Sequence, residues 1–321
     1  MCGIIGELSL DPDRSPVRFC ARHLDLLHHR GPDQQGWFLD RGLVLGFRRL
    51  AIIDTAGAHQ PLYDEDEGCV LTINGEIYNH RDLRRDLAAA HRFRTNGDGE
   101  VLIHLYQEHG LDLLRPVNGM YAFALYDRRQ RRLVLGRDRA GKKPLYWRWD
   151  GARLQWSSEL RPLLADGRPD LDRLAIDDYL RFGYIPAPAT PYAGIAKLPA
   201  GHLLVLDDAG TPRLERYAAL TWRRDERPEP SAAQVAMIAE EVRTRLDQAV
   251  GLRLESEVPL AFLLSGGLDS SAVFAAGART ATWARPLAYT IGIDDSEVDE
   301  TAVAAETARR YGAEHRIARI A

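Results

Sequence analysis

The chain has little cysteine and methionine, almost no lysine, and no long apolar run. Its three cysteines, Cys2, Cys20 and Cys69, are widely spaced and form no Cys-x-x-Cys pair, which argues against a disulfide framework and a cysteine-based metal site. No apolar run is long enough to span a bilayer. Arginines are scattered and the net charge is −4, so we expect neither nucleic-acid nor membrane partners. The composition indicates a globular protein of a reducing cytoplasm.

The most informative residue that the sequence does contain is Cys2, in the opening run Met1-Cys2-Gly3-Ile4-Ile5-Gly6. Removal of the initiator methionine would make this cysteine the N-terminal residue. One residue would then carry a thiol with a pKa near ~8.5 and an α-amine with a pKa near ~7.7–8. Such an amine can act as the general base for its own nucleophile. A chance cysteine is the alternative, so the rest of the sequence has to decide.

The length of 321 residues suits about two domains. Short strand-like runs are predicted at residues 3–8, 43–53, 69–73, 120–126, 133–136, 145–149 and 201–206. Helical periodicity predicts helices at 17–29, 81–89 and 100–109. Strands grouped around a few helices predict an α+β fold in layers. The proline-rich segment 185–191 predicts a stiff connector without a helix.

The second part of the chain has a different pattern. Residues 219–231 are charged and contain proline, and we interpret them as a linker between a first domain at 1–218 and a second at 232–321. A helix is predicted at 232–254, followed by a strand at 258–264, a helix at 268–278, a strand at 287–293 and a helix at 300–311. This alternation is typical of the start of a parallel α/β domain.

Four short motifs in the first domain share a chemical theme, namely the hydrolysis of a side-chain amide. They are Arg30-Gly31-Pro32-Asp33, Arg49-Leu50-Ala51-Ile52-Ile53-Asp54, Asn74-Gly75-Glu76-Ile77-Tyr78-Asn79 and Gly97-Asp98-Gly99-Glu100. A tetrahedral oxyanion needs preorganised donors, which Asn74 and the N–H of Gly75 could provide in a turn. Arg49 can hold a carboxylate, and Asp98 and Glu76 suit an ammonium group. Each motif alone reads as an ordinary turn or a solvated charge, but the combination with Cys2 favours catalysis.

With these motifs in this order, the chain resembles the glutamine-dependent asparagine synthetases, whose first domain is a class II (N-terminal nucleophile) glutamine amidotransferase. Further matches lie at residues 119–127, 136–146, 157–160, 182–186 and 197–201. The resemblance implies an αββα-layered glutaminase domain in which Cys2 is the nucleophile and Asn74 and Gly75 form the oxyanion hole. It also implies a set of glutamine-binding residues: Arg49, Leu50, Ile52, Ile53, Glu76 and Asp98.

A candidate nucleotide loop, Leu264-Ser265-Gly266-Gly267-Leu268-Asp269-Ser270-Ser271, lies between an apolar strand and a helix. Its backbone N–H groups and the helix N-terminus can meet an anion, and it lacks the glycine-lysine step of a Walker A loop. It resembles the pyrophosphate loop of the ATP-pyrophosphatase superfamily. That resemblance implies that Asp269 helps to hold Mg²⁺, and it implies a set of ATP-binding residues: Leu264, Ser265, Gly266, Gly267, Asp269, Ser270 and Ile291. Core packing is the alternative role of Leu264 and Ile291.

The whole resemblance implies a ligase that uses glutamine-derived ammonia to amidate aspartate through an acyl-adenylate, giving asparagine, glutamate, AMP and pyrophosphate. The second domain is expected to be incomplete, so that this chain alone would hydrolyse glutamine only. The alternatives are a bare glutaminase, a family member with another carboxylate acceptor, a binding or regulatory protein, and an enzyme that forms intramolecular amides. Cys2, Asn74 and Asp98 argue against the last. The partners would be small-molecule substrates, and a homodimer is an option that the resemblance offers.

Overall fold

The computed structural model describes residues 1–11, 13, 17–219, 221, 229–281, 285–294 and 299–320. The chain divides into two compact units, Met1–Thr221 and Trp222–Ala321. The predicted linker, 219–231, includes residues 220 and 222–228, which lie outside the described residues. The domain boundaries at 218 and 232 therefore stay predictions.

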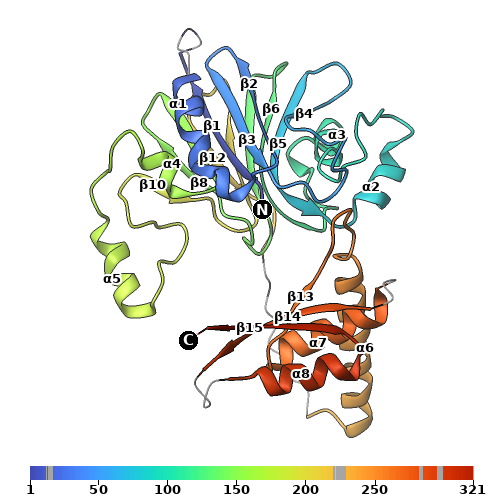
Figure 1. Cartoon of the computed structure of the whole chain (residues 1–321). Helices are drawn as coiled ribbons and strands as arrows, with labels where there is room; N and C mark the ends of the chain where they lie inside the picture. The colour runs from blue at the N-terminus through green and yellow to red at the C-terminus, as the bar shows by residue number, and fades with distance from the viewer. Residues whose placement is uncertain are drawn as a thin grey trace. The chain divides into compact units, whose positions relative to one another are not determined.

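Two six-stranded sheets form the first unit (Figure 1). The strands of one sheet are β1 (Gly3–Ser9), β2 (Gln34–Asp40), β3 (Leu43–Arg49), β8 (Tyr146–Trp149), β9 (Arg153–Ser157) and β10 (Ile195–Lys197). Those of the other are β4 (Leu62–Tyr63), β5 (Cys69–Ile77), β6 (Gly119–Asp127), β7 (Arg132–Arg137), β11 (His202–Leu206) and β12 (Arg213–Arg216). Their orders are β10-β8-β9-β1-β3-β2 and β12-β11-β7-β6-β5-β4. Neighbouring strands pair antiparallel in both sheets.

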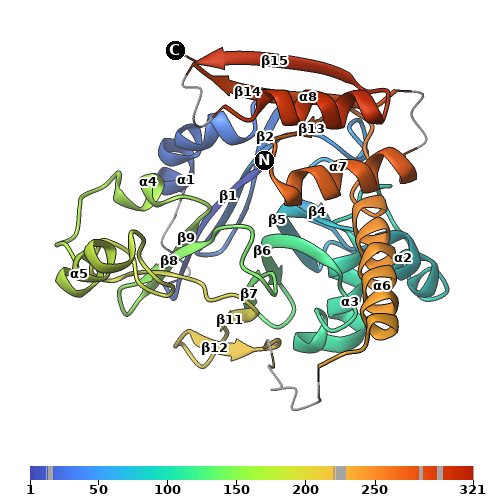
Figure 2. The same cartoon turned by 90° about the horizontal axis from the view of Figure 1, so that it is seen from below.

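Three apolar cores hold the layers of this unit together. Between the sheets, Ile4 and Phe47 pack with Ala122 and Leu135. The outer face of the second sheet packs against α2 (His80–Leu87) and α3 (Val101–His109). The outer face of the first sheet packs against α1 (Val17–His23), the 3₁₀ segment Leu24–Arg30 and α4 (Leu160–Leu164). Figure 2 shows these helices on opposite sides of the paired sheets. The layered αββα fold that the sequence predicted is thereby confirmed.

Several elements differ from the sequence prediction. Strand β3 ends at Arg49 instead of residue 53, and the predicted helix at 17–29 changes to a 3₁₀ segment after His23. Strand β5 continues to Ile77, so Asn74 and Gly75 lie inside a strand and not in a turn. The asparagine-glycine pair signals a turn in isolation, but pairing with β6 overrides that preference.

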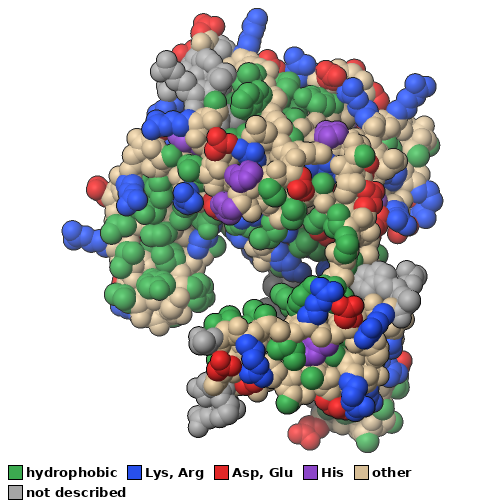
Figure 3. All heavy atoms as spheres, viewed as in Figure 1, with side chains coloured by type: hydrophobic (Ala, Val, Ile, Leu, Met, Phe, Trp, Pro, Cys, Tyr) green, Lys and Arg blue, Asp and Glu red, His purple; other side chains and the backbone are tan. Residues whose placement is uncertain are grey.

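The remaining helical elements of the first unit are the 3₁₀ turn Gly110–Asp112 and α5 (Arg173–Phe182). The proline-rich segment after α5 contains no helix, as predicted. Hydrophobic side chains gather over the α5 region in Figure 3, and those of Leu174, Leu180 and Phe182 are more than half exposed. Contiguous exposed apolar side chains are typical of surfaces that other chains or domains cover.

The second unit is a small parallel sheet with helices. Strands β13 (Phe262–Leu263), β14 (Leu287–Ile293) and β15 (Glu314–Ile320) lie in that order, with α6 (Ala232–Gly251), α7 (Leu268–Thr280) and α8 (Thr301–Arg310). The sequence prediction stopped at two strands, so β15 is an addition, and β13 is shorter than the predicted strand at 258–264. None of the described helices has both the length and the apolar character needed to cross a membrane.

Candidate active site

One pocket of the first unit collects the residues that the sequence nominated for glutamine hydrolysis. Its space is small, about 70 Å³. The nominated residues in its lining are Cys2, Arg49, Leu50, Ile52, Ile53, Asn74, Gly75, Glu76 and Asp98. They come from the start of β1, the end of β3 and the loop after it, the end of β5 and the loop before α3. Four separate stretches of the chain thus meet at one place.

Cys2 is held by contacts on both sides of its strand. Arg30 Nε donates a hydrogen bond of 2.9 Å to the backbone oxygen of Cys2, and Arg30 Nη1 lies 3.0 Å from the carboxylate of Glu159. The backbone N–H of Ile4 donates to Ser158 Oγ at 3.0 Å. The Cys2 thiol lies 3.7 Å from its acceptor, the backbone oxygen of Leu50. These contacts fix the sulfur at the pocket wall.

The loop after β3 is shaped by two charged side chains. Asp33 Oδ2 accepts a 2.9 Å hydrogen bond from the N–H of Ala51. Arg49 is 4% exposed, and its Nη2 donates to the backbone oxygens of Ile53 and Asp54 at 3.0 and 2.9 Å. The Arg-Gly-Pro-Asp motif therefore does more than turn the chain, because Arg30 contacts the backbone of Cys2 and Asp33 contacts the loop after β3.

Asn74 is the most unusual polar group of the pocket. Its side chain is 1% exposed, and neither Oδ1 nor Nδ2 has a hydrogen-bond partner among the residues that the structure describes. A buried amide without partners is destabilising by about 1–3 kcal/mol, so it calls for an explanation. At the neighbouring Gly75, an added Cβ would lie 2.3 Å from the backbone oxygen of Met120. Only glycine fits this close approach of β5 and β6.

The loop before α3 presents Asp98 to the pocket. Asp98 Oδ2 accepts a hydrogen bond of 2.6 Å from the N–H of Ile77. Arg84 of α2 donates to the backbone oxygens of Thr95 and Gly97 at 2.8 and 2.7 Å. The carboxylate thus sits on a segment that is tied to both β5 and α2.

Burial and charge set the protonation of the reacting groups. Burial raises the pKa of the Cys2 thiol. Partial burial lowers the pKa of the Met1 amine, and the charge of Lys143 lowers it further. Lys143 also lines the pocket and is 7% exposed, and burial lowers its own pKa. The same burial and the charge of Lys143 would act in the same direction on an amine at Cys2 if Met1 were removed, and an amine with a lowered pKa suits a general base.

The candidate nucleotide loop lies between β13 and α7 in the second unit. Its N–H groups already have acceptors: Ser265 Oγ for Gly267 at 3.1 Å, and the Glu300 carboxylate for Gly266 at 3.0 Å. The hydroxyls of Ser265 and Ser270 lie 2.8 Å apart. The loop is therefore compact and lies at the N-terminus of α7, where an anion is favoured.

The other nucleotide-site candidates differ in exposure. Asp269 is exposed in the first turn of α7. Leu264 is buried in the core of the second unit, as the packing alternative predicts. Ile291 is 61% exposed on β14.

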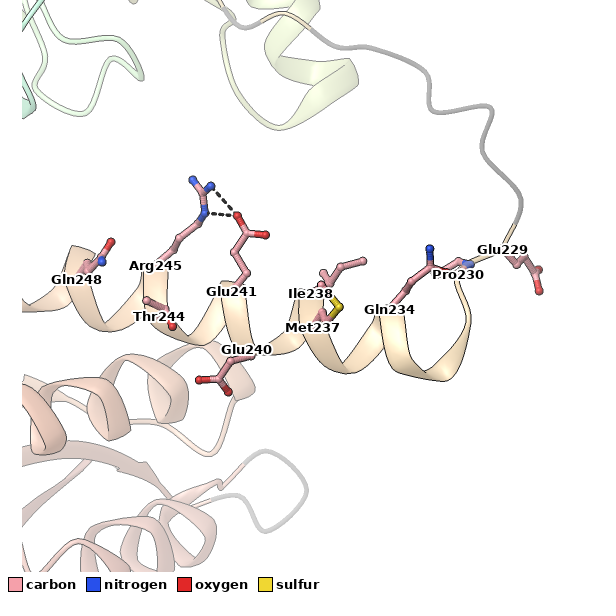
Figure 4. A pocket seen from close by; sticks show the side chains of 10 residues that line it. All are labelled: Glu229, Pro230, Gln234, Met237, Ile238, Glu240, Glu241, Thr244, Arg245 and Gln248. Carbon is pink, nitrogen blue, oxygen red and sulfur yellow. Dashed lines mark hydrogen bonds and ion pairs between the residues drawn. The ribbon is translucent and has the colours of Figure 1, made fainter.

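A larger hollow of about 1300 Å³ runs along α6. Figure 4 shows that its described lining side chains come from α6 and from Glu229 and Pro230, shortly before it. Most of them are strongly exposed, as Met237 is, and Glu241 pairs with Arg245. It contains none of the predicted site residues, and this open helix face offers no arrangement of catalytic groups.

Sequence reasoning missed three residues. Arg30 was read as part of a turn, although its motif was noticed. Lys143 is one of only three lysines in the chain, and the rarity of lysine was the only sequence feature that could have drawn attention to it. Glu300 lies 34 positions after the residue that it contacts, and no local pattern links the two.

The chain matches two family models, one in each part of the sequence. A family model described as a glutamine amidotransferase domain matches residues 1–218, and one described as asparagine synthase matches residues 241–321. The first match covers more than half of the chain, so the chain belongs to the glutamine amidotransferase domain family.

The relatives are longer proteins. Asparagine synthetase (glutamine-hydrolyzing) 1 of Bacillus subtilis (strain 168) is 30% identical over 320 residues, which are 98% of this chain and 49% of the relative. The asparagine synthetase (glutamine-hydrolyzing) of Asparagus officinalis is 38% identical over 283 residues, which are 87% of this chain and 42% of the relative. The chain thus spans about half the length of these curated relatives.

One solved structure supports the fold. The glutamine phosphoribosylpyrophosphate amidotransferase of B. subtilis, solved in complex with ADP and GMP, has a TM-score of 0.50 and 17% identity. The match covers 99% of this chain and 81% of that chain. At this identity the likeness concerns the fold alone.

Proposed function

We propose that Cys2 hydrolyses glutamine and that, in a longer enzyme, the ammonia serves the ATP-dependent amidation of aspartate to asparagine. The observation that carries the first half is the buried Asn74 amide, which has no partner among the described residues and lines the same pocket as the Cys2 thiol. A hydrogen-bond donor that has no acceptor in such a pocket is suited to stabilise the negative charge that develops on the oxygen in the transition state.

The chemistry starts with removal of Met1, which makes the amine of Cys2 free. This amine takes the thiol proton while the sulfur attacks the side-chain carbonyl carbon of glutamine. The resulting oxyanion accepts hydrogen bonds from Asn74 Nδ2 and from the N–H of Gly75. When the intermediate collapses, the C–N bond breaks and ammonia leaves with the proton that the amine held. Water then attacks the thioester, which releases glutamate and restores the thiol.

The walls of the pocket would recognise the amino-acid end of glutamine. Arg49 supplies positive charge for the carboxylate, and Asp98 with Glu76 supplies negative charge for the ammonium group. Backbone groups of the segment 50–53 would add hydrogen bonds, since the contacts of Asp33 and Arg49 fix that segment. Met1 also lines the pocket, so that its removal would both free the amine and enlarge the space for substrate.

The loop at Ser265–Ser270 would hold the phosphates of ATP. An added Cβ at Gly266 would lie 2.9 Å from the Cβ of Glu300, so glycine lets the loop pack closely against Glu300, whose carboxylate occupies the N–H that a phosphate would take. Gly267 and the hydroxyls of Ser265 and Ser270 complete this cradle, and Asp269 would help to hold Mg²⁺. Bound ATP would supply the adenylyl group that activates the acceptor carboxylate.

Leu264 and Ile291 would contact the base of ATP, although the burial of Leu264 also suits a core role. A cytoplasmic location and a homodimer complete the proposal. Both follow from the resemblance to the synthetases.

A glutamine analogue with a reactive diazoketone, 6-diazo-5-oxo-norleucine, tests the glutaminase half. Intact-mass measurement should first show that Met1 is removed, and the analogue should then modify one residue per chain. Cys2→Ala should abolish the modification. Processed wild-type chain that stays unmodified would favour a binding protein instead.

The acceptor needs its own assay, since the alternatives are a bare glutaminase and another carboxylate substrate. Glutamine, ATP and aspartate are incubated with the protein, and asparagine and pyrophosphate are quantified beside glutamate. Asparagine and pyrophosphate in equal amounts support the synthetase. Glutamate alone supports the bare glutaminase for this chain, and pyrophosphate formation with another acid identifies another acceptor.

A further inference from the structure

A second cluster of reactive side chains lies outside the glutamine pocket. It consists of Glu65 in the loop between β4 and β5, His91 in the loop after α2, and His104 on α3. One potential ligand atom from each of the three lies within 4.8 Å of the others. The side chain of His104 is fully buried, while those of His91 and Glu65 are 10% and 33% exposed. The three groups therefore form a half-buried site that remains open to solvent at Glu65.

Each histidine of the cluster has a carboxylate on its Nε2 side. His91 Nε2 lies 2.8 Å from Glu108 Oε1, and His104 Nε2 lies 3.6 Å from Glu100 Oε1. Histidines that bind a metal generally turn their second ring nitrogen toward a carboxylate or a carbonyl, which orients the ring and makes the ligand more basic. His91 has that arrangement through Glu108, which leaves its Nδ1 for a ligand. His104 has it through the side-chain oxygen of Gln107 on Nδ1, which leaves Nε2, an atom without a hydrogen-bond partner among the described residues.

The free nitrogen of His91 faces the carboxylate of the cluster, whereas Nδ1 of His104 is held by an amide oxygen that orients its ring. His91 Nδ1 lies 3.6 Å from Glu65 Oε1, and His104 Nδ1 lies 2.9 Å from Gln107 Oε1. The two imidazole rings have centroids 4.6 Å apart. Two imidazoles and one carboxylate are a common ligand set for Zn²⁺, with bonds of about 2.0–2.2 Å. Tetrahedral geometry at those lengths sets the ligand atoms roughly 3.3 Å apart, so a small inward movement would complete the shell.

We propose that Glu65, His91 and His104 bind a divalent transition-metal ion, with Zn²⁺ the best fit to the ligand set. Glu108 and Gln107 orient the two histidines. A water molecule fills the fourth position. The ion would tie three segments that are separate in sequence.

This site has a connection to the glutamine pocket. The buried carboxylate of Glu100 also accepts hydrogen bonds from the N–H groups of Arg94 and Thr95 at 2.6 and 2.8 Å. Those residues lead directly to Asp98, which lines the pocket. An ion held at His104 would therefore stiffen the loop that carries Asp98, a proposed glutamine-binding residue. The role of the ion would then be structural.

The test is a titration of the protein with Zn²⁺ in a calorimeter, repeated with Co²⁺ in place of Zn²⁺ because Co²⁺ can be observed spectroscopically. It is made in the Cys2→Ala chain, because the thiol could bind either ion. We expect one ion per chain, and Co²⁺ absorption bands in the visible that indicate four-coordination without a thiolate. Glu108→Gln should weaken binding roughly 10- to 100-fold, as losses of orienting partners do, and Glu65→Gln and His91→Ala should weaken it further. The matched control is His109→Ala, an exposed histidine of the same helix, which should leave the affinity unchanged.

Two outcomes would overturn the proposal. One is the absence of stoichiometric binding by the folded Cys2→Ala chain, which would leave the cluster as a network of contacts between histidines and carboxylates. The other is binding that Glu65→Gln and His91→Ala do not weaken, since the ion would then be held elsewhere. Circular dichroism of each variant keeps loss of folding separate from loss of a ligand.

Discussion

The replacement Asn74→Ala separates catalysis from stability at one buried position. Loss of one oxyanion donor raises the activation barrier by about 2.7–4 kcal/mol, which lowers kcat roughly 10²- to 10³-fold. The same change removes a buried amide that has no partner among the described residues, and such a group is destabilising by about 1–3 kcal/mol. This relief offsets the packing that the smaller side chain loses. We therefore expect a large fall in kcat with little change in the free energy of unfolding.

Thr72→Val is the matched control for that variant. Thr72 lies two positions earlier on β5, so its side chain shares the face of Asn74. It is also fully buried, and its Oγ1 likewise has no hydrogen-bond partner among the described residues. This isosteric change should raise stability and leave kcat unchanged.

The assay for both variants is release of glutamate at saturating glutamine, beside urea unfolding of the same samples. A kcat of Asn74→Ala within about threefold of the wild type would refute the oxyanion role, because the missing donor should have a far larger effect. A similar loss of kcat in Thr72→Val would show that the measurement reports packing between the sheets. Either result would contradict the proposed catalytic role of Asn74.

Three further changes test other parts of the site. Lys143→Gln removes a cation that lowers the pKa of the Met1 amine and should act in the same direction on the Cys2 amine that removal of Met1 exposes. The acid limb of the kcat/KM profile should therefore move to higher pH, whereas Lys143→Arg should keep it in place. Arg49→Ala should raise the KM for glutamine more than it lowers kcat, as loss of uniform binding does, and an unchanged KM would remove Arg49 from substrate binding. Gly75→Ala places a Cβ 2.3 Å from the backbone oxygen of Met120, so the free energy of unfolding measured in urea should fall by roughly 1–3 kcal/mol. An unchanged free energy of unfolding would contradict the close approach of the strands.

Local sequence patterns were sufficient to predict most of the helices and strands. The strand at 287–293 was predicted with the bounds that the structure shows, and α3 begins within one residue of its predicted start. The layered fold followed from the number of short strands around few helices. The segment at 314–320 carries four charged or histidine side chains among seven residues, which hides its strand character, and pairing with β14 forms the strand nonetheless.

The candidate site was predictable where one short motif carries one role. Cys2, Asn74 and Asp98 each belong to such a motif, and all three line the same pocket. Arg30 and Lys143 were missed because their importance depends on contacts between distant segments. The same reason hides the cluster at His91 and His104, whose ligand atoms come together only after the loops and helices have packed.

The position of Cys2 directly ahead of β1 has a practical consequence for anyone who produces this protein. A purification handle fused in front of Met1 would keep the proposed catalytic amine of Cys2 as a peptide nitrogen and crowd the pocket that Met1 already lines. Handles therefore belong at the other terminus, or behind a protease site whose cleavage leaves cysteine as the first residue. If Cys2 has the proposed role, a preparation that keeps residues ahead of it should fold correctly and yet fail to hydrolyse glutamine.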